Sequence, residues 1–192
     1  VTAAVTSLKQ YSWAFDTSGM NGGADATFYH VTPDADYYWL GDYLDPAKSW
    51  KTGPIGAATL TAKEVGVPIG PPLLIQPTSC TLIWRDNGGH GQHDGSIWQV
   101  NPPNGYQALG VILQAGYNAP DLTMYRCVHT SQVGTTTTGP RWTDIYSGAK
   151  MDISVFSILN FATTPAPTGL LVGQANYNSY DGTAYMIKGV TE

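Results

Sequence analysis

Short stretches of alternating apolar and polar residues recur along the chain, separated by turns rich in Gly and Pro. In residues 96–100 (Ser-Ile-Trp-Gln-Val), alternation places Ile97 on one face of a strand and Trp98 on the other. The Asn-Pro-Pro-Asn-Gly run that follows ends this strand, because Pro cannot donate to a β-ladder and Gly accepts positive φ. Residues 57–64 are the best helix candidate and could equally be a loop. The pattern therefore predicts an all-β protein.

One of these segments is written three times. The clearest copy is Asp94-Gly95-Ser96-Ile97-Trp98-Gln99-Val100, and the other two copies are residues 25–31 and 152–158. Each copy reads acid, any residue, small hydroxyl, apolar, aromatic, any residue, β-branched. Self-similarity of this kind indicates an architecture built from repeated units.

The residues before each copy also correspond. Trp84 and Asp86 recur 58 residues later as Trp142 and Asp144, so we expect the recurrent tryptophans to lie in the core. The first unit supplies Asp16, which is one position out of register, and we expect an insertion or bulge there. A carboxylate that recurs in this way is more typical of a scaffold than of a unique catalytic centre.

The repeats predict a single domain over residues 1–192, with units at approximately residues 11–75, 80–130 and 138–190. Units this small cannot each bury an apolar face alone, so they have to share one core. We therefore predict a β-prism with three pseudo-threefold related sheets around one core. A Gly follows both Leu40 and Leu109, which indicates a bulge or a tight backbone contact at each position.

Composition narrows the classes of partner. The 192 residues include only nine Lys and Arg against fourteen Asp and Glu, for a net charge of −5. Scattered cations disfavour nucleic-acid binding and strong attraction to anionic lipid, but they do not disfavour a neutral headgroup. The hydrophobic share of 42% argues against disorder, and no apolar run reaches the 18 or so residues of a transmembrane helix.

Cys80 and Cys127 are the two cysteines, and both lie in apolar, strand-like segments. A disulfide between them would fit a secreted protein, whereas two buried thiols would fit a cytosolic one. Low charge, abundant Thr and Gly, and a first residue Val1 in place of Met favour the disulfide and secretion. A cytoplasmic or vacuole-associated location is the alternative.

Several runs of the second and third units carry a resemblance to a known family. They are Leu82-Ile83-Trp84-Arg85-Asp86, Asp94-Gly95-Ser96-Ile97-Trp98, Pro102-Pro103-Asn104-Gly105-Tyr106-Gln107-Ala108-Leu109-Gly110, Tyr125-Arg126-Cys127-Val128-His129 and Trp142-Thr143-Asp144. These runs resemble the vacuolar protein sorting-associated protein 62 family from about Phe28 to Ile158. The resemblance implies a fold similar to the multivesicular-body-associated β-prism, and similar prisms act as lectin-like or membrane-binding modules. The chain departs from the family pattern at His90, His93 and Phe156.

Acidic residues flank the Gly-rich loops of the units. Asp86 and Asp94 flank the loop of the second unit, and Asp144 and Asp152 flank that of the third. Each pair could bind Ca²⁺ or accept hydrogen bonds from sugar hydroxyls. The alternative is that the carboxylates cap the amides of their own turns, and repetition favours it. A capped loop can still present a ligand.

The loop of the second unit also contains His90 and His93 beside Asp94. With Asp86, these residues could bind Zn²⁺ in a metal-dependent hydrolase. Exposed loop residues without metal are the favoured interpretation, because a Gly-rich loop does not fix ligand geometry. The chain has no nucleophile, phosphate-loop or dinucleotide motif, and we expect no cofactor.

Aromatic residues complete the candidate site. Neighbours in a strand face opposite sides, so the three rings of Tyr37, Tyr38 and Trp39 cannot all point into one core. At least one of them is therefore exposed or packs on another element. Tyr177 and Tyr180 lie among Asn and Gly near the C-terminus. We expect a non-enzymatic recognition module that binds a glycan or lipid headgroup through these residues. A toxin or effector component acting on membranes is a further alternative.

Overall fold

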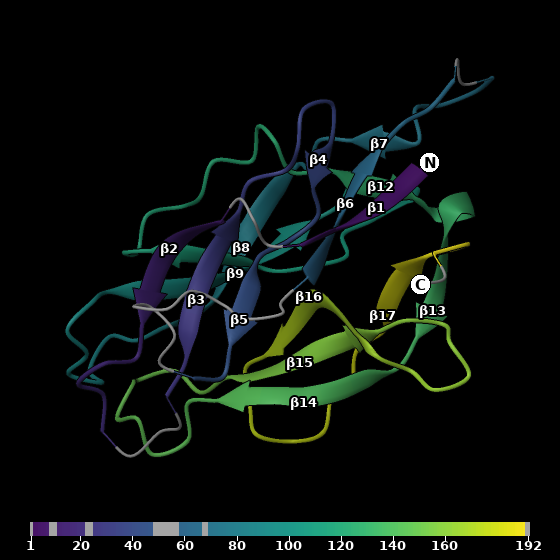
Figure 1. Cartoon of the computed structure of the whole chain (residues 1–192). Helices are drawn as coiled ribbons and strands as arrows, with labels where there is room; N and C mark the ends of the chain where they lie inside the picture. The colour runs from purple at the N-terminus through teal and green to yellow at the C-terminus, as the bar shows by residue number, and fades with distance from the viewer. Residues whose placement is uncertain (1, 8–10, 22–24, 48–57, 67–68, 191–192) are drawn as a thin grey trace.

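The structure, a computed structural model, describes residues 2–7, 11–21, 25–47, 58–66 and 69–190 (Figure 1). These residues form six small antiparallel sheets, and the described part of the chain contains one 3-10 turn, η1 (Thr130–Gln132), and no α-helix. The predicted all-β class is confirmed. The predicted helix or loop at residues 57–64 is wrong, since β6 (Ala58–Lys63) occupies it as a strand. None of the described residues belongs to a helix long and apolar enough to cross a bilayer.

Three of the sheets have three strands each and carry the repeat in their central strand. The first contains β2 (Tyr11–Asp16), β3 (Thr27–Val31) and β5 (Tyr43–Asp45); the second contains β8 (Ser79–Arg85), β9 (Gly95–Asn101) and β11 (Ile112–Ala115); the third contains β14 (Thr138–Thr143), β15 (Ser154–Leu159) and β16 (Pro167–Gln174). The register of the first strand against the central one shifts once in each sheet, before Phe15, Trp84 and Trp142. Because these positions correspond in the repeat, the three sheets are structural copies of one another.

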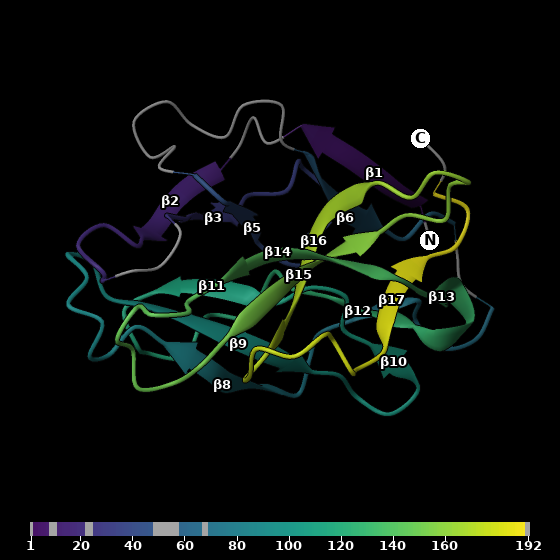
Figure 2. The ribbon, with the colours of Figure 1, turned by 90° about the horizontal axis from the view of Figure 1, so that it is seen from below.

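The other three sheets lie away from the long loops of the first three (Figures 1 and 2). They consist of β1 (Thr2–Ser7), β6 and β4 (Tyr38–Trp39); of β10 (Tyr106–Gln107), β12 (Cys127–His129) and β7 (Leu74–Ile75); and of β13 (Val133–Thr136) and β17 (Ala184–Ile187). They contribute much of a second apolar cluster, and the long loops are left as one separate end of the molecule.

One buried cluster draws on all of the first three sheets. Its large members are Phe15, Phe28, Trp84, Ile97, Trp142 and Val155. The ring of Phe15 stacks on Phe28 with centroids 4.0 Å apart, and Trp84 meets Trp142 edge to face at 5.8 Å. Full burial of each such side chain contributes roughly 1.5–3 kcal/mol. The predicted core positions of Trp84 and Trp142 are confirmed, and Trp98 is also buried, in a third cluster.

The expected close contact at the two Leu-Gly pairs is confirmed. A Cβ on Gly41 would lie 2.7 Å from the Cα of Gly110, and the amide of Gly110 donates to the carbonyl of Leu40 at 2.9 Å. The amide of Val111 donates in turn to the carbonyl of Leu171 at 3.0 Å. Backbone of the first, second and third units is therefore joined directly, and only glycine leaves room for that approach.

Candidate functional site

The long loops of the first three sheets meet at one end of the molecule, here called the loop end: residues 17–21, 25–26, 86–94 and 144–153 (Figures 1 and 2). The amide of Gln92 donates to the carbonyl of Ser18 at 2.7 Å, which joins the first loop to the second. The amide of Lys150 donates to the carbonyl of Asn87 at 3.0 Å, which joins the second to the third. The three loops therefore form one continuous surface.

Asp86 and Asp144 close the second and third loops from inside. Gly95 donates its amide to Asp86 Oδ1 at 3.1 Å, and Ile153 donates to Asp144 Oδ1 at 2.9 Å. Both carboxylates are buried. Burial raises the pKa of Asp86, and the hydrogen bonds that it accepts oppose this shift. Both acids therefore accept the backbone amides of their own loops, as in the turn-capping alternative derived from the sequence.

In the first unit the position of Asp86 belongs to Thr17 and not to Asp16, which instead accepts from the amide of Ser18 at 2.8 Å. The expected bulge is present between Trp13 and Phe15, but the expected insertion is not. The amide of Thr17 donates to the carbonyl of Ala26 at 3.1 Å, and the amide of Ala26 donates to Thr17 Oγ1 at 2.9 Å. No insertion is needed, because Thr17 precedes Asp86 by the same 69 residues that separate Asp25 from Asp94. A hydroxyl therefore replaces the carboxylate.

A tyrosine joins the two acids in the second and third units. Tyr117 Oη lies 2.8 Å from Asp86 Oδ1 and 3.1 Å from Asp94 Oδ1. Tyr177 Oη lies 3.0 Å from Oδ1 of Asp144 and 3.1 Å from Oδ1 of Asp152. Burial and then the carboxylates raise the pKa of both phenols, so each keeps its proton and donates it to one acid at a time.

These two groups are here called the second-unit cluster (Asp86, Asp94, Tyr117) and the third-unit cluster (Asp144, Asp152, Tyr177). The structure thus brings the four predicted acids and Tyr177 together at the loop end. Sequence reasoning missed Tyr117. Its signal was weak, because it precedes Tyr177 by 60 residues whereas the acids are 58 apart.

A groove of about 420 Å³ opens beside the third-unit cluster. Its walls include Arg141, Thr143, Phe156, Tyr177, Asn178 and Ser179. This volume lies within the range of about 300–1,000 Å³ that is usual for small-molecule sites.

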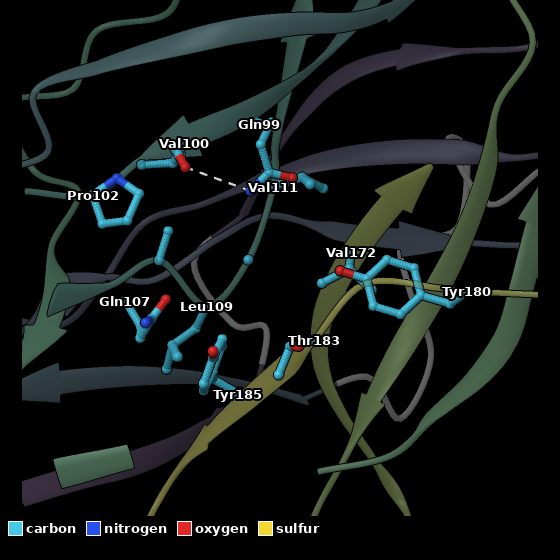
Figure 3. A pocket seen from close by; sticks show the side chains of 12 residues that line it. Gln99, Val100, Pro102, Gln107, Leu109, Val111, Val172, Tyr180, Thr183 and Tyr185 are labelled. Carbon is cyan, nitrogen blue, oxygen red and sulfur yellow. Dashed lines mark hydrogen bonds between the residues drawn. The ribbon is translucent and has the colours of Figure 1, made fainter. Parts of the chain in front are cut away.

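Tyr180 lines a different and smaller cavity of about 100 Å³ (Figure 3). In that cavity, Tyr180 and Tyr185 of the C-terminal segment lie with Gln107 and Leu109 of the second unit. The ring of Tyr180 also packs on Phe156 with centroids 5.6 Å apart. Such a volume admits a few waters but no sugar ring, so Tyr180 and Tyr177 do not share one site.

His90 and His93 are exposed on the second loop, and the ring of His93 meets Trp13 edge to face at 4.8 Å. Among the described residues, no three His, Cys, Asp or Glu side chains gather as metal ligands. The arrangement of this loop therefore lacks the three protein ligands that a catalytic zinc site uses.

Tyr37 and Trp39 lie outside the loop end. Trp39 is buried against Tyr125, with ring centroids 5.3 Å apart, and so is not presented to a ligand. Tyr37 is half-buried, and the ammonium of Lys63 lies 4.8 Å from its ring centroid. The sequence-predicted cluster of these two residues is not part of the candidate site.

The predicted disulfide is not formed. Cys80 and Cys127 are free thiols on different sheets, Cys80 opposite Val100 and Cys127 opposite Ile75. Burial raises the pKa of both thiols, that of Cys127 to about 12. The alternative with two thiols in an apolar cluster describes the structure, although Cys80 is partly exposed.

A buried His–Asp pair was not expected from the sequence. Asp42 is fully buried and accepts from His30 Nδ1 at 2.8 Å and from the amides of Val31 and Leu113. Burial alone would lower the pKa of His30, but the charge and hydrogen bond of Asp42 raise it overall. Burial raises the pKa of Asp42 against the opposing effect of His30. The pair ties the first unit to the second.

Comparison with known proteins relates the chain to one family and one fold. Residues 2–181 match the family described as vacuolar protein sorting-associated protein 62. No curated protein matches the chain. The crystal structure of GNIP1Aa from Chromobacterium piscinae is similar, with a TM-score of 0.72 and 24% identity over 92% of this chain. The match covers 33% of that longer protein, and at this identity it shows the shared fold alone.

Proposed function

We propose that this chain, which belongs to the vacuolar protein sorting-associated protein 62 family, is a non-enzymatic recognition module whose loop end binds a glycan or a sugar-bearing lipid headgroup. The observation that carries the proposal is the convergence of the three loops, which are joined through Gln92 to Ser18 and through Lys150 to Asn87. A surface assembled from three separate loops can contact a ligand from several sides.

The chemistry of the loop end suits a ligand rich in hydroxyl groups. Asp94 and Asp152 are exposed and can accept hydrogen bonds from hydroxyls. Trp13, Tyr146 and Tyr177 are exposed by 42%, 79% and 42%, and aromatic rings pack on the apolar face of a sugar. The net charge of −5 disfavours an anionic membrane as the main partner.

We also propose that the sheets are arranged as a β-prism. The three sheets that carry the repeat would be the faces of a β-prism around the cluster that contains Phe15, Trp84 and Trp142. Their matching register shifts and their shared apolar cluster support this arrangement. In a prism of this kind the loops between the first two strands of each sheet share one end, which is the proposed binding end.

A glycan array combined with liposome flotation tests the proposed function. The vesicles are phosphatidylcholine alone and phosphatidylcholine with a neutral glycolipid. We expect array signals for neutral sugars, or flotation that depends on the glycolipid. A folded protein that gives no signal in either assay contradicts the proposal, and flotation with phosphatidylcholine alone would move the function to the bilayer itself.

Two other proposals call for their own measurements. A role as a toxin or effector component that acts on membranes is the first of these, and haemolysis assays test it. Secretion is the second of these. Because Cys80 and Cys127 form no disulfide, this proposal rests on composition, and fractionation of the native protein tests it. A hydrolase role for His90 and His93 has less support, because the described residues supply no third ligand.

A further inference from the structure

The second-unit and third-unit clusters differ in what covers the tyrosine ring. In the second unit the guanidinium of Arg85 lies 5.5 Å from the ring centroid of Tyr117, which is half-buried. Thr143 takes the position of Arg85 in the third unit, at the same offset of 58 residues that relates Trp84 to Trp142. A short side chain cannot reach the ring, and Tyr177 is 42% exposed.

The uncovered ring of Tyr177 faces the groove of about 420 Å³, which Thr143 also lines. The phenol oxygen is held by Asp144 at 3.0 Å and by Asp152 at 3.1 Å. This anchoring fixes the orientation of the ring before any ligand arrives, which reduces the entropy lost on binding. The ring is therefore a preorganised platform in the largest of the grooves described above.

We propose that this groove is a subsite for an uncharged pyranose sugar, which stacks on the ring of Tyr177. Thr143, Asn178 and Ser179 line the same groove and supply short neutral groups that can donate to and accept from sugar hydroxyls. This inference rests on the proposed function and deepens it, since it assigns the ligand class and a subsite that adjoins the loop end through the contacts of Tyr177 with Asp144 and Asp152.

The charges around the groove favour a neutral ligand over an anionic one. Arg141 is the cation in its wall, and its Nε and Nη2 donate to the carbonyl of Leu44 at 3.0 and 2.7 Å. Nη2 also lies 2.8 Å from the hydroxyl of Tyr43. The partners of Arg141 are neutral, so it keeps its one positive charge. Asp144 and Asp152, which accept from the phenol oxygen of Tyr177, bring two carboxylates close to the same groove, so the local charge balance disfavours a phosphate or sialic acid.

Calorimetric titration of matched variants tests the inference. The probes are neutral oligosaccharides of glucose, N-acetylglucosamine, mannose and galactose, with sialyllactose as the anionic comparison. We expect Tyr177→Ala to lose about tenfold or more in affinity for the neutral sugar that binds, because a well-stacked ring contributes on the order of a factor of ten. Tyr117→Ala removes the corresponding ring of the second unit and should change affinity less than about twofold.

Thr143→Arg provides a variant that keeps Tyr177 and all its hydrogen bonds. It transfers the covering arginine of the second unit to the third and should reduce affinity by about tenfold through occupation of the groove. Tyr177→Phe keeps the ring but loses its two anchoring contacts, so it should lose less affinity than Tyr177→Ala. If wild-type protein binds a neutral sugar and neither Tyr177→Ala nor Thr143→Arg weakens it, the inference is wrong while the proposed function stands. If wild-type protein binds none of the sugars on the array or in titration and does not float with the glycolipid vesicles, the proposed function itself fails.

Discussion

The second and third units build the same tyrosine–carboxylate cluster, but they finish it differently. In each unit a buried acid, Asp86 or Asp144, closes the loop and is here called the inner acid. A tyrosine hydroxyl contacts both this acid and the exposed one, Asp94 or Asp152, which is the outer acid. Arg85 covers the ring in the second unit, whereas Thr143 leaves the ring open in the third. The hydrogen bonds that recur in both units close the loops. Whether the tyrosine ring is open to a ligand depends instead on the residue beside it, Arg85 or Thr143.

The inner acids also differ in how firmly they are tied to the rest of the core. Trp84 of the second unit donates its Nε1 to Asp144 Oδ2 at 2.7 Å, so the third-unit cluster is bonded across units. The position of Trp84 belongs to Phe15 in the first unit, which has no N–H to offer to Asp86 in the corresponding way. The third-unit cluster is therefore the better anchored of the two.

The largest expected effect is a graded loss of stability when the three loop-closing residues are truncated. We expect Asp144→Ala to lower the free energy of unfolding by about 3 kcal/mol, because Trp84 Nε1 and the amide of Ile153 lose their buried acceptor. Asp86→Ala should cost about 2 kcal/mol and Thr17→Ala about 1 kcal/mol, since fewer donors are orphaned. Urea denaturation measures the series, and equal losses at all three positions would contradict the ranking.

The next effect separates stability from binding within the two clusters. Tyr117→Phe and Tyr177→Phe each remove the one proton held between two carboxylates, and each should cost about 1 kcal/mol. Urea denaturation should therefore give the same loss of stability for the two variants, although only changes at Tyr177 are expected to weaken sugar binding. A large difference between their unfolding midpoints would show that the clusters are not equivalent in the scaffold.

A pH-dependent effect is expected at Asp42, which stands where the second unit has Val111. The pKa of His30 is raised, so its contribution to stability is complete below about 6.5 and is lost as the pH rises through the folded-state pKa. The raised pKa of Asp42 acts in the same direction, because the folded state binds its proton more tightly. The urea midpoint should therefore be lower at pH 9 than at pH 6.

His30→Gln is the control for this prediction. Glutamine can still donate to Asp42 but does not titrate, so the difference between the two pH values should shrink. An unchanged difference in His30→Gln would assign the pH dependence to another group.

The smallest expected effect is that of uncovering Tyr117. Arg85→Thr removes a cation–π contact worth roughly 0.5–1 kcal/mol at an exposed site, and stability should fall by no more than that. If cover by arginine is what distinguishes the two clusters, calorimetry should detect a second, weaker sugar site in this variant. Unchanged stoichiometry would mean that the groove walls, rather than the cover, decide binding.

Much of the fold could be predicted from the sequence, because packing demands recur in each unit. Trp84 and Trp142 lie in the core because their positions in the repeat need a large apolar side chain to fill the space between the sheets. Thr17 was missed because a hydroxyl and a carboxylate can accept the same backbone amide, so residue type alone did not mark the position.

The candidate site was only partly predictable, because it depends on contacts between distant loops. Repetition and composition select Asp86, Asp94, Asp144, Asp152 and Tyr177 as candidates, whereas the contacts between tyrosine and acids that join them could not be predicted. Alternation along a strand could not tell that Trp39 packs on Tyr125 or that Cys80 and Cys127 belong to different sheets. Those outcomes depend on how sheets pack on one another.

The most direct test of the open third-unit groove is amide NMR during titration with the neutral sugar that binds best. If the sugar binds in this groove, shift changes concentrate at Thr143 and at residues 177–179, while Tyr117 and Asn118 of the second unit stay unchanged. Saturable shift changes centred on the second-unit cluster, with residues 177–179 unaffected, would contradict it.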